Sequence, residues 1–323
     1  MSYRPGATHA TLRARAALLD RVRAFFAARG VLEVETPTLS RAGAPDPALS
    51  QIEARVRSLG PGPCYLHTSP EYAMKRLLAA GSGDIYQLCR VYRDDELGRW
   101  HQPEFTLLEW YRVGFDDARL MDEVDELLQQ LLGHRLARPS RRLTYAEAFE
   151  RAVGASPHAG ADTVRAALGK RGVEVPPGLE ETAVLDLAFG VLVANAFEPG
   201  ALTFVHDFPA THAALAKLKP GPPPVAARFE VFAGGIELGN GFAELTDPVE
   251  QRRRFEADNE RRRRTGQPVV PLDEDFLAAL ATLPECAGVA LGVDRIVALA
   301  EGLPDVASAM AFAHSASRNE DRA

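Results

Sequence analysis

The sequence predicts an α+β fold in which helices flank an antiparallel sheet. Two pairs of segments have the composition and alternation of strands: residues 85–93 with 104–112, and residues 228–233 with 236–242. The second pair closes around Gly234-Gly235, a dipeptide typical of hairpin turns. Segments with helical periodicity precede, separate and follow these strands.

The N-terminal region predicts one helix followed by one strand. Residues 11–29 place large apolar side chains on one helical stripe, and Gly30 ends it. Residues 31–35 have the pattern of a short strand that Pro37 stops. A loop rich in proline, glycine and alanine follows, to about residue 50.

Capping residues mark the starts of later helices. Ser69-Pro70-Glu71 combines a serine cap, a proline at the first position and an acid in the first turn, which predicts a helix ending at residue 81. Residues 116–132 have amphipathic helical spacing. Thr144 with Glu147 is a capping box that opens a further helix.

The second half of the chain alternates between helical and strand-like regions. Residues 139–197 are rich in alanine and lie between strand-rich regions, so we interpret them as a helical insertion. Asp247-Pro248 starts a helix with two arginine clusters, residues 252–254 and 261–264. Residues 288–291 predict a strand that runs into a helix at residue 292.

Composition restricts the class of protein. The chain has 323 residues, 46% hydrophobic and 25% charged, enough for one large catalytic domain with an insertion. A net charge of −7 argues against a protein that grips a long nucleic acid. Cys64, Cys89 and Cys286 form no CxxC pair, so we expect no zinc site or disulfide. With neither a signal peptide nor a membrane span, we expect a cytoplasmic protein.

The first stretch suited to chemistry is the predicted hairpin from Arg90 to Arg112. Alternation along its second strand puts Phe105, Glu109 and Tyr111 on one face, where they suit a flat ring and an ammonium group. Arg93 ends the first strand and can bind a phosphate through its forked guanidinium. The alternative is a solvated hairpin with a half-buried aromatic face.

Two further stretches have weaker signals. In ELGNGFAE, Glu237 and Glu244 can hold Mg²⁺ through carboxylate oxygens, although surface acids at a polar turn would have the same pattern. In GVALGVDR, glycines before a helix let the backbone approach an anion, and Arg295 lies in the first turn. Glycine-rich strand-to-helix turns are also common without any ligand.

Taken in order, these stretches resemble the three motifs of class II aminoacyl-tRNA synthetases. RGVLEVETPTL resembles motif 1 of the dimer interface, YRDDE with HQPEF resembles motif 2, and GVALGVDR resembles motif 3. Their flanks, TSPEYAMKRLL, HQPEFTLLEWY and GGIELGNGFAELTD, are similar to lysyl-tRNA synthetases. The resemblance covers nearly the whole chain and implies the class II antiparallel sheet flanked by helices.

A closer resemblance is to the elongation factor P–(R)-β-lysine ligases, also called the EpmA, PoxA or GenX group. These are short relatives of lysyl-tRNA synthetase without an anticodon-binding domain. The resemblance implies one catalytic domain over residues 1–323, with the insertion at about 139–197 and no anticodon-binding domain. Ala290 supports this closer resemblance, because lysyl-tRNA synthetases have glycine at this position and the ligase group has alanine.

The resemblance implies a role for each matching residue. Arg93 and Arg295 are the expected catalytic residues, and Glu237 and Glu244 the expected metal ligands. The ATP site is expected to comprise Arg93, Asp94, Asp95, His101, Gln102, Phe105, Glu237, Leu238, Gly292 and Arg295. The amino-acid site is expected to comprise Ser69, Pro70, Glu71, Glu109, Tyr111, Glu244 and Ala290.

Two positions depart from the family pattern. Motif 2 usually reads FRNE and here reads YRDD, so Asp95 is one methylene shorter than the usual glutamate and could reach ATP through a water. Gln102 stands where asparagine is usual. Neither change removes the functional group, so we expect activity to persist.

The resemblance implies an ATP- and Mg²⁺-dependent homodimer that activates (R)-β-lysine or lysine and transfers it to elongation factor P. A truncated synthetase that charges tRNA or a tRNA-like RNA is an alternative, supported by the arginine-rich helix; the acidic balance argues against stable tRNA binding. A non-catalytic regulator would be expected to lose the ATP-contacting arginines and carboxylates, which this chain keeps. An amide former like asparagine synthetase fits the lysine-type flanks poorly.

Overall fold

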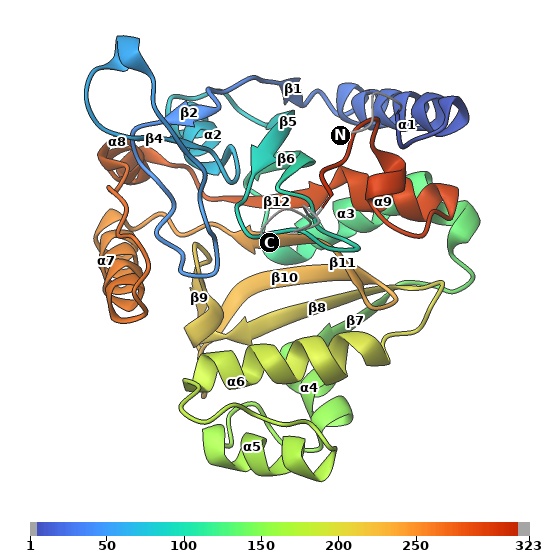
Figure 1. Ribbon diagram of the computed structural model, residues 1–323, viewed down its shortest axis with the longest axis vertical. Helices are drawn as coiled ribbons and strands as arrows, with labels where there is room; N and C mark the ends of the chain where they lie inside the picture. The colour runs from blue at the N-terminus through green and yellow to red at the C-terminus, as the bar shows by residue number, and fades with distance from the viewer. Residues whose placement is uncertain (1–4, 316–323) are drawn as a thin grey trace, which may run out of the picture. The chain divides into compact units, whose positions relative to one another are not determined.

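The computed structural model describes residues 5–315. The chain folds as two compact units (Figure 1). The first comprises the described residues up to Tyr111, together with Thr246–Pro284 and those from Leu291 onward. The second comprises Arg112–Leu245 and Glu285–Ala290. Each unit packs helices against strands, which confirms the α+β class.

The main strands of the first unit are β1 (Leu32–Glu33), β5 (Ile85–Tyr92) and β6 (Glu104–Val113). β5 and β6 pair antiparallel, whereas β1 pairs parallel with β5. Helices α1 (His9–Ala27) and α9 (Val293–Glu301) pack against each other. Phe26 of α1 is fully buried and stacks on Tyr86 of β5 with 4.4 Å between ring centroids, which fixes the helix on the strands.

A second group of elements in this unit surrounds α2 (Glu71–Ala79). Strands β2 (Leu39–Ser40), β3 (Glu53–Ala54) and β4 (Cys64–Leu66) form a small sheet in the order β2-β4-β3. Helix α2 packs against α8 (Glu274–Ala279), where Tyr72 stacks on Phe276 at 4.4 Å. Helix α7 (Pro248–Arg264) contacts α8 in turn.

The strands of the second unit follow the order β12-β11-β10-β8-β7, with β9 paired to β10. Their bounds are β7 (Arg141–Thr144), β8 (Leu202–Pro209), β9 (Leu218–Lys219), β10 (Val225–Ala233), β11 (Ile236–Ala243) and β12 (Cys286–Gly292). The β10–β11 hairpin confirms the prediction around Gly234-Gly235. β7 pairs parallel with β8. β1–β5 is also a parallel pair, and the β5–β6, β8–β10, β9–β10 and β10–β11 pairs are antiparallel, as predicted for this α+β fold.

The helices of the second unit are α3 (Asp117–Leu132), α4 (Tyr145–Val153), α5 (Ala161–Lys170) and α6 (Glu181–Ala188). The stretch 139–197 contains α4, α5 and α6, and also the short strand β7. Tyr145 and Phe149 of α4 pack with Phe189 and Phe208 into one buried aromatic cluster. This cluster joins the helices to the strands.

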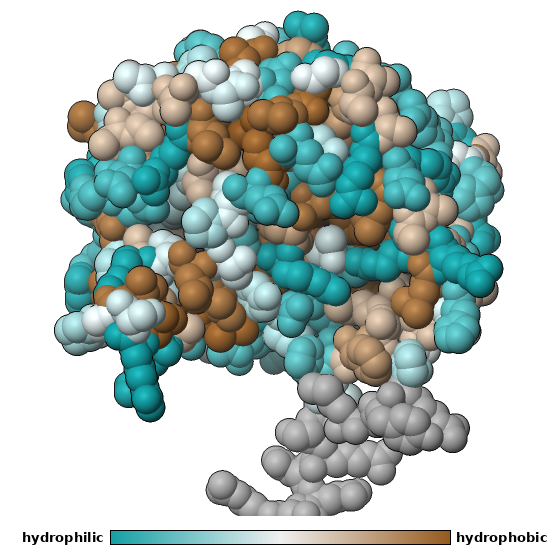
Figure 2. Space-filling model, turned by 90° about the horizontal axis from the view of Figure 1, so that it is seen from above, coloured by the Kyte–Doolittle hydropathy of each residue, from teal (hydrophilic) through white to brown (hydrophobic). Residues whose placement is uncertain are grey.

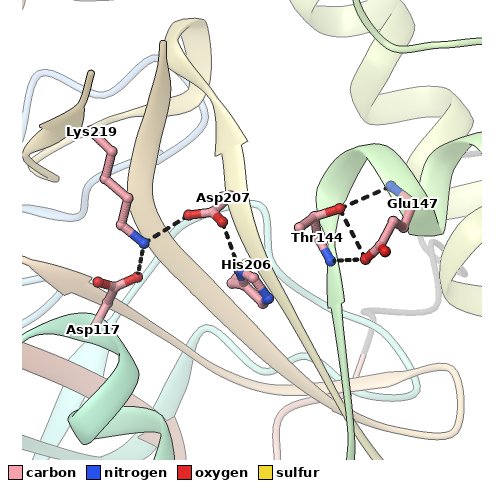
Figure 3. Close-up of polar contacts among 6 residues, drawn as sticks. All are labelled: Asp117, Thr144, Glu147, His206, Asp207 and Lys219. Atoms are coloured by element: carbon pink, nitrogen blue, oxygen red, sulfur yellow. Dashed lines mark hydrogen bonds and ion pairs between the residues drawn. The ribbon is translucent and has the colours of Figure 1, made fainter. Parts of the chain in front are cut away.

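Polar contacts also join elements within the second unit (Figure 3). Lys219 Nζ donates to Asp117 Oδ2 at 2.6 Å and to Asp207 Oδ1 at 2.7 Å. A hydrogen bond from the neighbouring His206, together with Lys219, lowers the pKa of Asp207 to about 2. These contacts hold Asp207 in a left-handed conformation, with φ +58°.

The capping predictions had mixed outcomes. Thr144 and Glu147 form the predicted capping box, in which the Glu147 N–H donates to Thr144 Oγ1 at 3.1 Å and the Thr144 N–H donates to Glu147 Oε2 at 2.9 Å (Figure 3). Asp247 caps α7 as predicted. Pro70, rather than Ser69, occupies the N-cap position of α2. Of the predicted strand at 31–35, only Leu32–Glu33 pairs.

Among the described residues, none of the helices is long and apolar enough to span a membrane. All three cysteines are free thiols. Within residues 5–315 there is also no group of three or more histidine, cysteine, aspartate and glutamate side chains that could hold a metal ion.

Candidate active site

A buried carboxylate forms the centre of the amino-acid side of the candidate site. Glu109 of β6 is 2% exposed. Its Oε1 accepts a hydrogen bond from the Tyr111 hydroxyl at 2.6 Å, and its Oε2 accepts one from the Ser69 hydroxyl at 2.7 Å. Glu109 and Tyr111 lie two positions apart on one strand and therefore share a face, as the alternation predicted. The structure thus brings together three of the predicted substrate residues.

The electrostatics of this carboxylate suit a cationic ligand. Burial, and to a lesser extent the nearby charge of Glu71, raise the pKa of Glu109 from 4.5 to about 7. The hydrogen bonds from Tyr111 and Ser69 and the charge of Lys75 act in the opposite direction. An ionised carboxylate held away from water is stabilised by an opposite charge, and an ammonium group supplies one.

The start of α2 connects Glu71 to the same cluster. The Glu71 N–H donates to Ser69 Oγ at 3.0 Å, so one serine hydroxyl contacts both the helix start and Glu109. Lys75 Nζ donates to Glu71 Oε1 at 2.6 Å, and Lys75 is only 1% exposed. Pro70 is buried at the helix start. The two carboxylates and one buried ammonium leave the cluster with an excess of negative charge when Glu109 is ionised.

Arg93 and Phe105 form the best-defined part of the expected ATP site. The Arg93 guanidinium carbon lies 5.1 Å from the centroid of the Phe105 ring, and both side chains are partly exposed. Arg93 Nη1 also lies 3.6 Å from Glu96 Oε1. A partly exposed ring beside a guanidinium can offer a stacking surface to a flat base and a cation to a phosphate.

The turn after Arg93 is held by backbone contacts on both sides. The Arg93 N–H donates to the Pro103 carbonyl and the Asp94 N–H to the Ser50 carbonyl, each at 2.9 Å. Asp95 has φ +60°, and its N–H donates to Asp94 Oδ1 at 2.9 Å. Both acidic side chains are exposed. The turn is therefore held by the backbone of Ser50 and Pro103 as well as by the Asp94 side chain.

His101 and Gln102 have different surroundings. His101 is exposed, and its carbonyl accepts a hydrogen bond from the Gly98 N–H at 3.1 Å. Gln102 is 3% exposed and exchanges hydrogen bonds with the His314 backbone: its Oε1 accepts at 2.8 Å and its Nε2 donates at 3.3 Å. The Gln102 amide thus anchors the C-terminal segment, and its expected contact with ATP stays a prediction.

Arg295 is anchored to the loop between β5 and β6. Gly292 is the N-cap residue of α9, and Arg295 Nε donates to the Trp100 carbonyl at 3.0 Å. The adjacent Asp294 is buried and accepts from Arg15 Nη1 and from the Thr106 N–H, both at 2.6 Å. Because Thr106 follows Phe105, these contacts position Arg295 relative to the strand that holds the predicted stacking ring.

The remaining predicted residues belong to the second unit. In the β10–β11 pairing, Val231 lies opposite Gly239 but Phe232 lies opposite Glu237, so β11 has one extra residue at Leu238. This bulge shifts the alternation, so Glu237 lies on the same face of β11 as Phe242, and Glu244 directly follows the end of the strand. Leu238 and Glu244 are each 1% exposed. Ala290 of β12 is half-buried.

The chain is similar to known proteins over nearly its whole length. The family model for "tRNA synthetases class II (D, K and N)" matches residues 1–316. The chain belongs to this family. It is 46% identical over 320 residues to an elongation factor P–(R)-β-lysine ligase of Vibrio atlanticus, a match that covers 96% of this chain and 98% of that protein. The protein of the same name from Salmonella arizonae is 47% identical over 320 residues, covering 96% of this chain and 97% of that protein.

In this class II synthetase family member, sequence analysis missed three residues that support the site. Lys75 was missed although Glu71 and Lys75 have the i,i+4 spacing of a helical ion pair, which was a usable signal. Arg15 and Asp294 were missed because their partners are distant in sequence. Their contact joins positions 279 residues apart, and nothing local predicts it.

Proposed function

We propose that this protein activates (R)-β-lysine, or lysine, with ATP and ligates it to a lysine ε-amine of elongation factor P. The observation on which this depends most is the buried Glu109 carboxylate, held by Ser69 and Tyr111, which suits the side-chain ammonium of a lysine-like substrate. The names of relatives at 46% and 47% identity, aligned over nearly their whole length, support the same reaction.

In the first step, the substrate carboxylate attacks the α-phosphorus of ATP and pyrophosphate leaves. Because two anions must meet, the protein's main task is to neutralise charge and hold geometry rather than to move a proton. We assign Arg93 to the α-phosphate and Arg295 to the far end of the triphosphate. The Phe105 ring beside Arg93 is the stacking surface for the adenine.

Glu237 and Glu244 have the chemistry to hold a magnesium ion. Mg²⁺ prefers carboxylate oxygens and keeps waters and substrate phosphates in its shell. Glu237 of β11 and Glu244, which directly follows the strand, both offer carboxylate oxygens. When bound, the ion would offset negative charge on the triphosphate. Ala290 has a methyl group where lysyl-tRNA synthetases have glycine, and we propose that this narrows the amino-acid site toward a β-amino acid.

In the second step, the activated acyl group passes to an amine. A lysine ε-amine has a resting pKa of about 10.4, so it must lose a proton before it attacks. We propose that a phosphate oxygen of the adenylate accepts this proton. Pyrophosphate and AMP are then the two products derived from ATP.

Charging of tRNA is the competing function, and its best support was the arginine-rich helix α7. Most of these arginines have acidic partners nearby: Arg252 pairs with Glu274, Arg253 and Arg254 with Glu250, Arg261 with Asp258, and Arg263 with Glu260. Arg262 is buried. A run whose charge is largely offset along its own surface is a poor phosphate-binding stripe. We therefore propose elongation factor P, rather than tRNA, as the acceptor.

We also propose a homodimer and a cytoplasmic location. Leu32 and Leu39, in the region that resembles the dimer-interface motif, are 56% and 39% exposed. Figure 2 shows hydrophobic residues in brown among hydrophilic ones in teal on the surface it displays. Light scattering should give twice the 35.0 kDa chain mass, and a monomer at micromolar concentration would contradict the dimer.

One assay tests the proposed acceptor. The enzyme and ATP are incubated with radiolabelled (R)-β-lysine or α-lysine, and with either elongation factor P or bulk tRNA. We expect label on elongation factor P, more from β-lysine than from α-lysine, and none when the acceptor lysine of the factor is replaced by arginine. Label on tRNA alone would reject the proposed function in favour of a truncated synthetase.

A further inference from the structure

Arg262 differs from the other arginines of α7 in its surroundings. It is 4% exposed, and every hydrogen bond recorded for its side chain goes to a backbone carbonyl. Three of the four acceptors lie more than 200 positions earlier in the chain: Nε donates to Pro45 at 2.9 Å, and Nη2 donates to Asp46 at 2.9 Å and to Leu49 at 2.5 Å. A planar guanidinium with several fixed donors suits this task.

The acceptors belong to the segment between β2 and β3, here called the 43–50 segment. It contains Pro45 and Pro47, which have no N–H to donate, so the segment can form few backbone hydrogen bonds of its own. Two further contacts attach it to the chain after α7: Gln267 Nε2 donates to the Pro47 carbonyl, and the Gly43 N–H donates to the Pro271 carbonyl, each at 3.1 Å. Figure 1 shows this blue segment passing close to α7.

The end of the 43–50 segment contacts the expected ATP site. The Ser50 carbonyl accepts from the Asp94 N–H at 2.9 Å, directly after Arg93. The Pro103 carbonyl holds Arg93 on the other side. The turn between Arg93 and Pro103 includes Asp95 at φ +60°, a left-handed conformation that few residues other than glycine, asparagine and aspartate adopt. A displacement of the 43–50 segment therefore removes one of the two backbone supports of this turn.

We propose that Arg262 is a positioning residue for ATP binding, which acts through the 43–50 segment and the Ser50–Asp94 hydrogen bond on the placement of Arg93. This rests on the proposed role of Arg93 at ATP. The amino-acid cluster of Ser69 and Glu109 has its own hydrogen bonds, so it does not depend on this route.

The test compares Arg262→Met with Arg263→Met. Methionine keeps much of the length of the arginine stem but removes every donor, whereas the Arg263 side chain is 60% exposed and pairs only with Glu260 among the contacts recorded for it. The first readout is amide hydrogen exchange of peptides covering residues 91–98. The second is the dissociation constant of ATP, measured by calorimetry on the full chain.

We expect R262M to exchange faster in this peptide and to bind ATP about tenfold more weakly, since a misplacement of about 1 Å can cost up to about a hundredfold in rate. R263M should match the wild type in both readouts, and R262K should recover part of the loss. If R262M fails to fold, Gln267→Ala, which removes a single hydrogen bond, should give a smaller change of the same sign.

The outcomes distinguish a failure of the Arg262 proposal from a failure of the proposed function. Unchanged exchange at residues 91–98 in both R262M and Q267A would overturn it. So would faster exchange with an unchanged ATP dissociation constant, because Arg262 would then have only a structural role. Wild-type protein that binds ATP but does not activate lysine or β-lysine would reject the proposed function and leave the ATP readout decisive for Arg262.

Discussion

The raised pKa of Glu109 makes substrate binding depend on pH in a defined direction. Burial raises this pKa from 4.5 to about 7, a change that corresponds to about 3 kcal/mol against the ionised form in the free protein. A substrate ammonium requires the ionised form. Below pH 7 the carboxyl group must lose its proton before it can pair with the substrate, so the apparent affinity falls about tenfold for each pH unit.

The expected result is a KM for (R)-β-lysine about ten times higher at pH 6 than at pH 8. The assay is ATP–pyrophosphate exchange at saturating ATP, so that protonation of the nucleotide does not enter. The substrate ε-ammonium, with a pKa of about 10.4, stays charged throughout this range. A KM that does not change between pH 6 and pH 8 would refute the assignment of Glu109 as the ammonium partner.

The matched variant is Glu109→Gln, which keeps the shape and one acceptor oxygen but removes the charge and replaces the second acceptor with an N–H donor. Truncating one partner of a buried charge pair costs about 2–5 kcal/mol, so kcat/KM for the amino acid should fall at least about 30-fold and lose its pH dependence. The same substitution should affect stability in the opposite direction from its effect on activity. A carboxyl group with a raised pKa in the folded state favours folding least when it is ionised, so E109Q should melt no lower than the wild type at pH 8.

Three further predictions concern stability and nucleotide binding. Lys75→Met leaves Glu71 without its buried ammonium partner and should destabilise the protein by about 3–5 kcal/mol, seen as a lower denaturation midpoint; a change below about 1 kcal/mol would mean that this pair is not buried in solution. Thr144→Ala removes the cap of α4 and should cost about 1 kcal/mol, or about 2 °C in Tm, with Thr211→Ala as an exposed control. Phe105→Leu should raise the KM for ATP several-fold and leave the KM for the amino acid unchanged, because stacking on an aromatic ring contributes about 1–3 kcal/mol per base; equal increases in both constants would contradict its assignment to the adenine.

Local patterns predicted the parts of the site that lie within one strand or one helix start. Alternation alone put Glu109 and Tyr111 on one face, and their hydrogen bond confirms this. The Thr144–Glu147 capping box was equally visible because its partners are three residues apart. The hairpin around Gly234-Gly235 followed from turn chemistry.

Contacts between distant segments could not be predicted in this way. The Arg15–Asp294 ion pair and the hydrogen bonds between the Gln102 amide and the His314 backbone depend on how elements distant in sequence pack together. No local sequence preference predicts either contact. The bulge at Leu238 is a similar case. Simple alternation would put Glu237 and Phe242, which are five positions apart, on opposite strand faces, and only the register of the neighbouring strand shows that they share one.

The most direct measurement of the central claim is amino-acid-dependent ATP–pyrophosphate exchange by the wild type and by Arg93→Ala. We expect exchange with (R)-β-lysine, and a loss of at least about 10²–10³-fold in the variant, as is typical when one preorganised charge-stabilising group is removed. The variant should remain folded by circular dichroism and Tm. Near-normal exchange in Arg93→Ala, or no exchange by the wild type with either lysine isomer, would contradict the account.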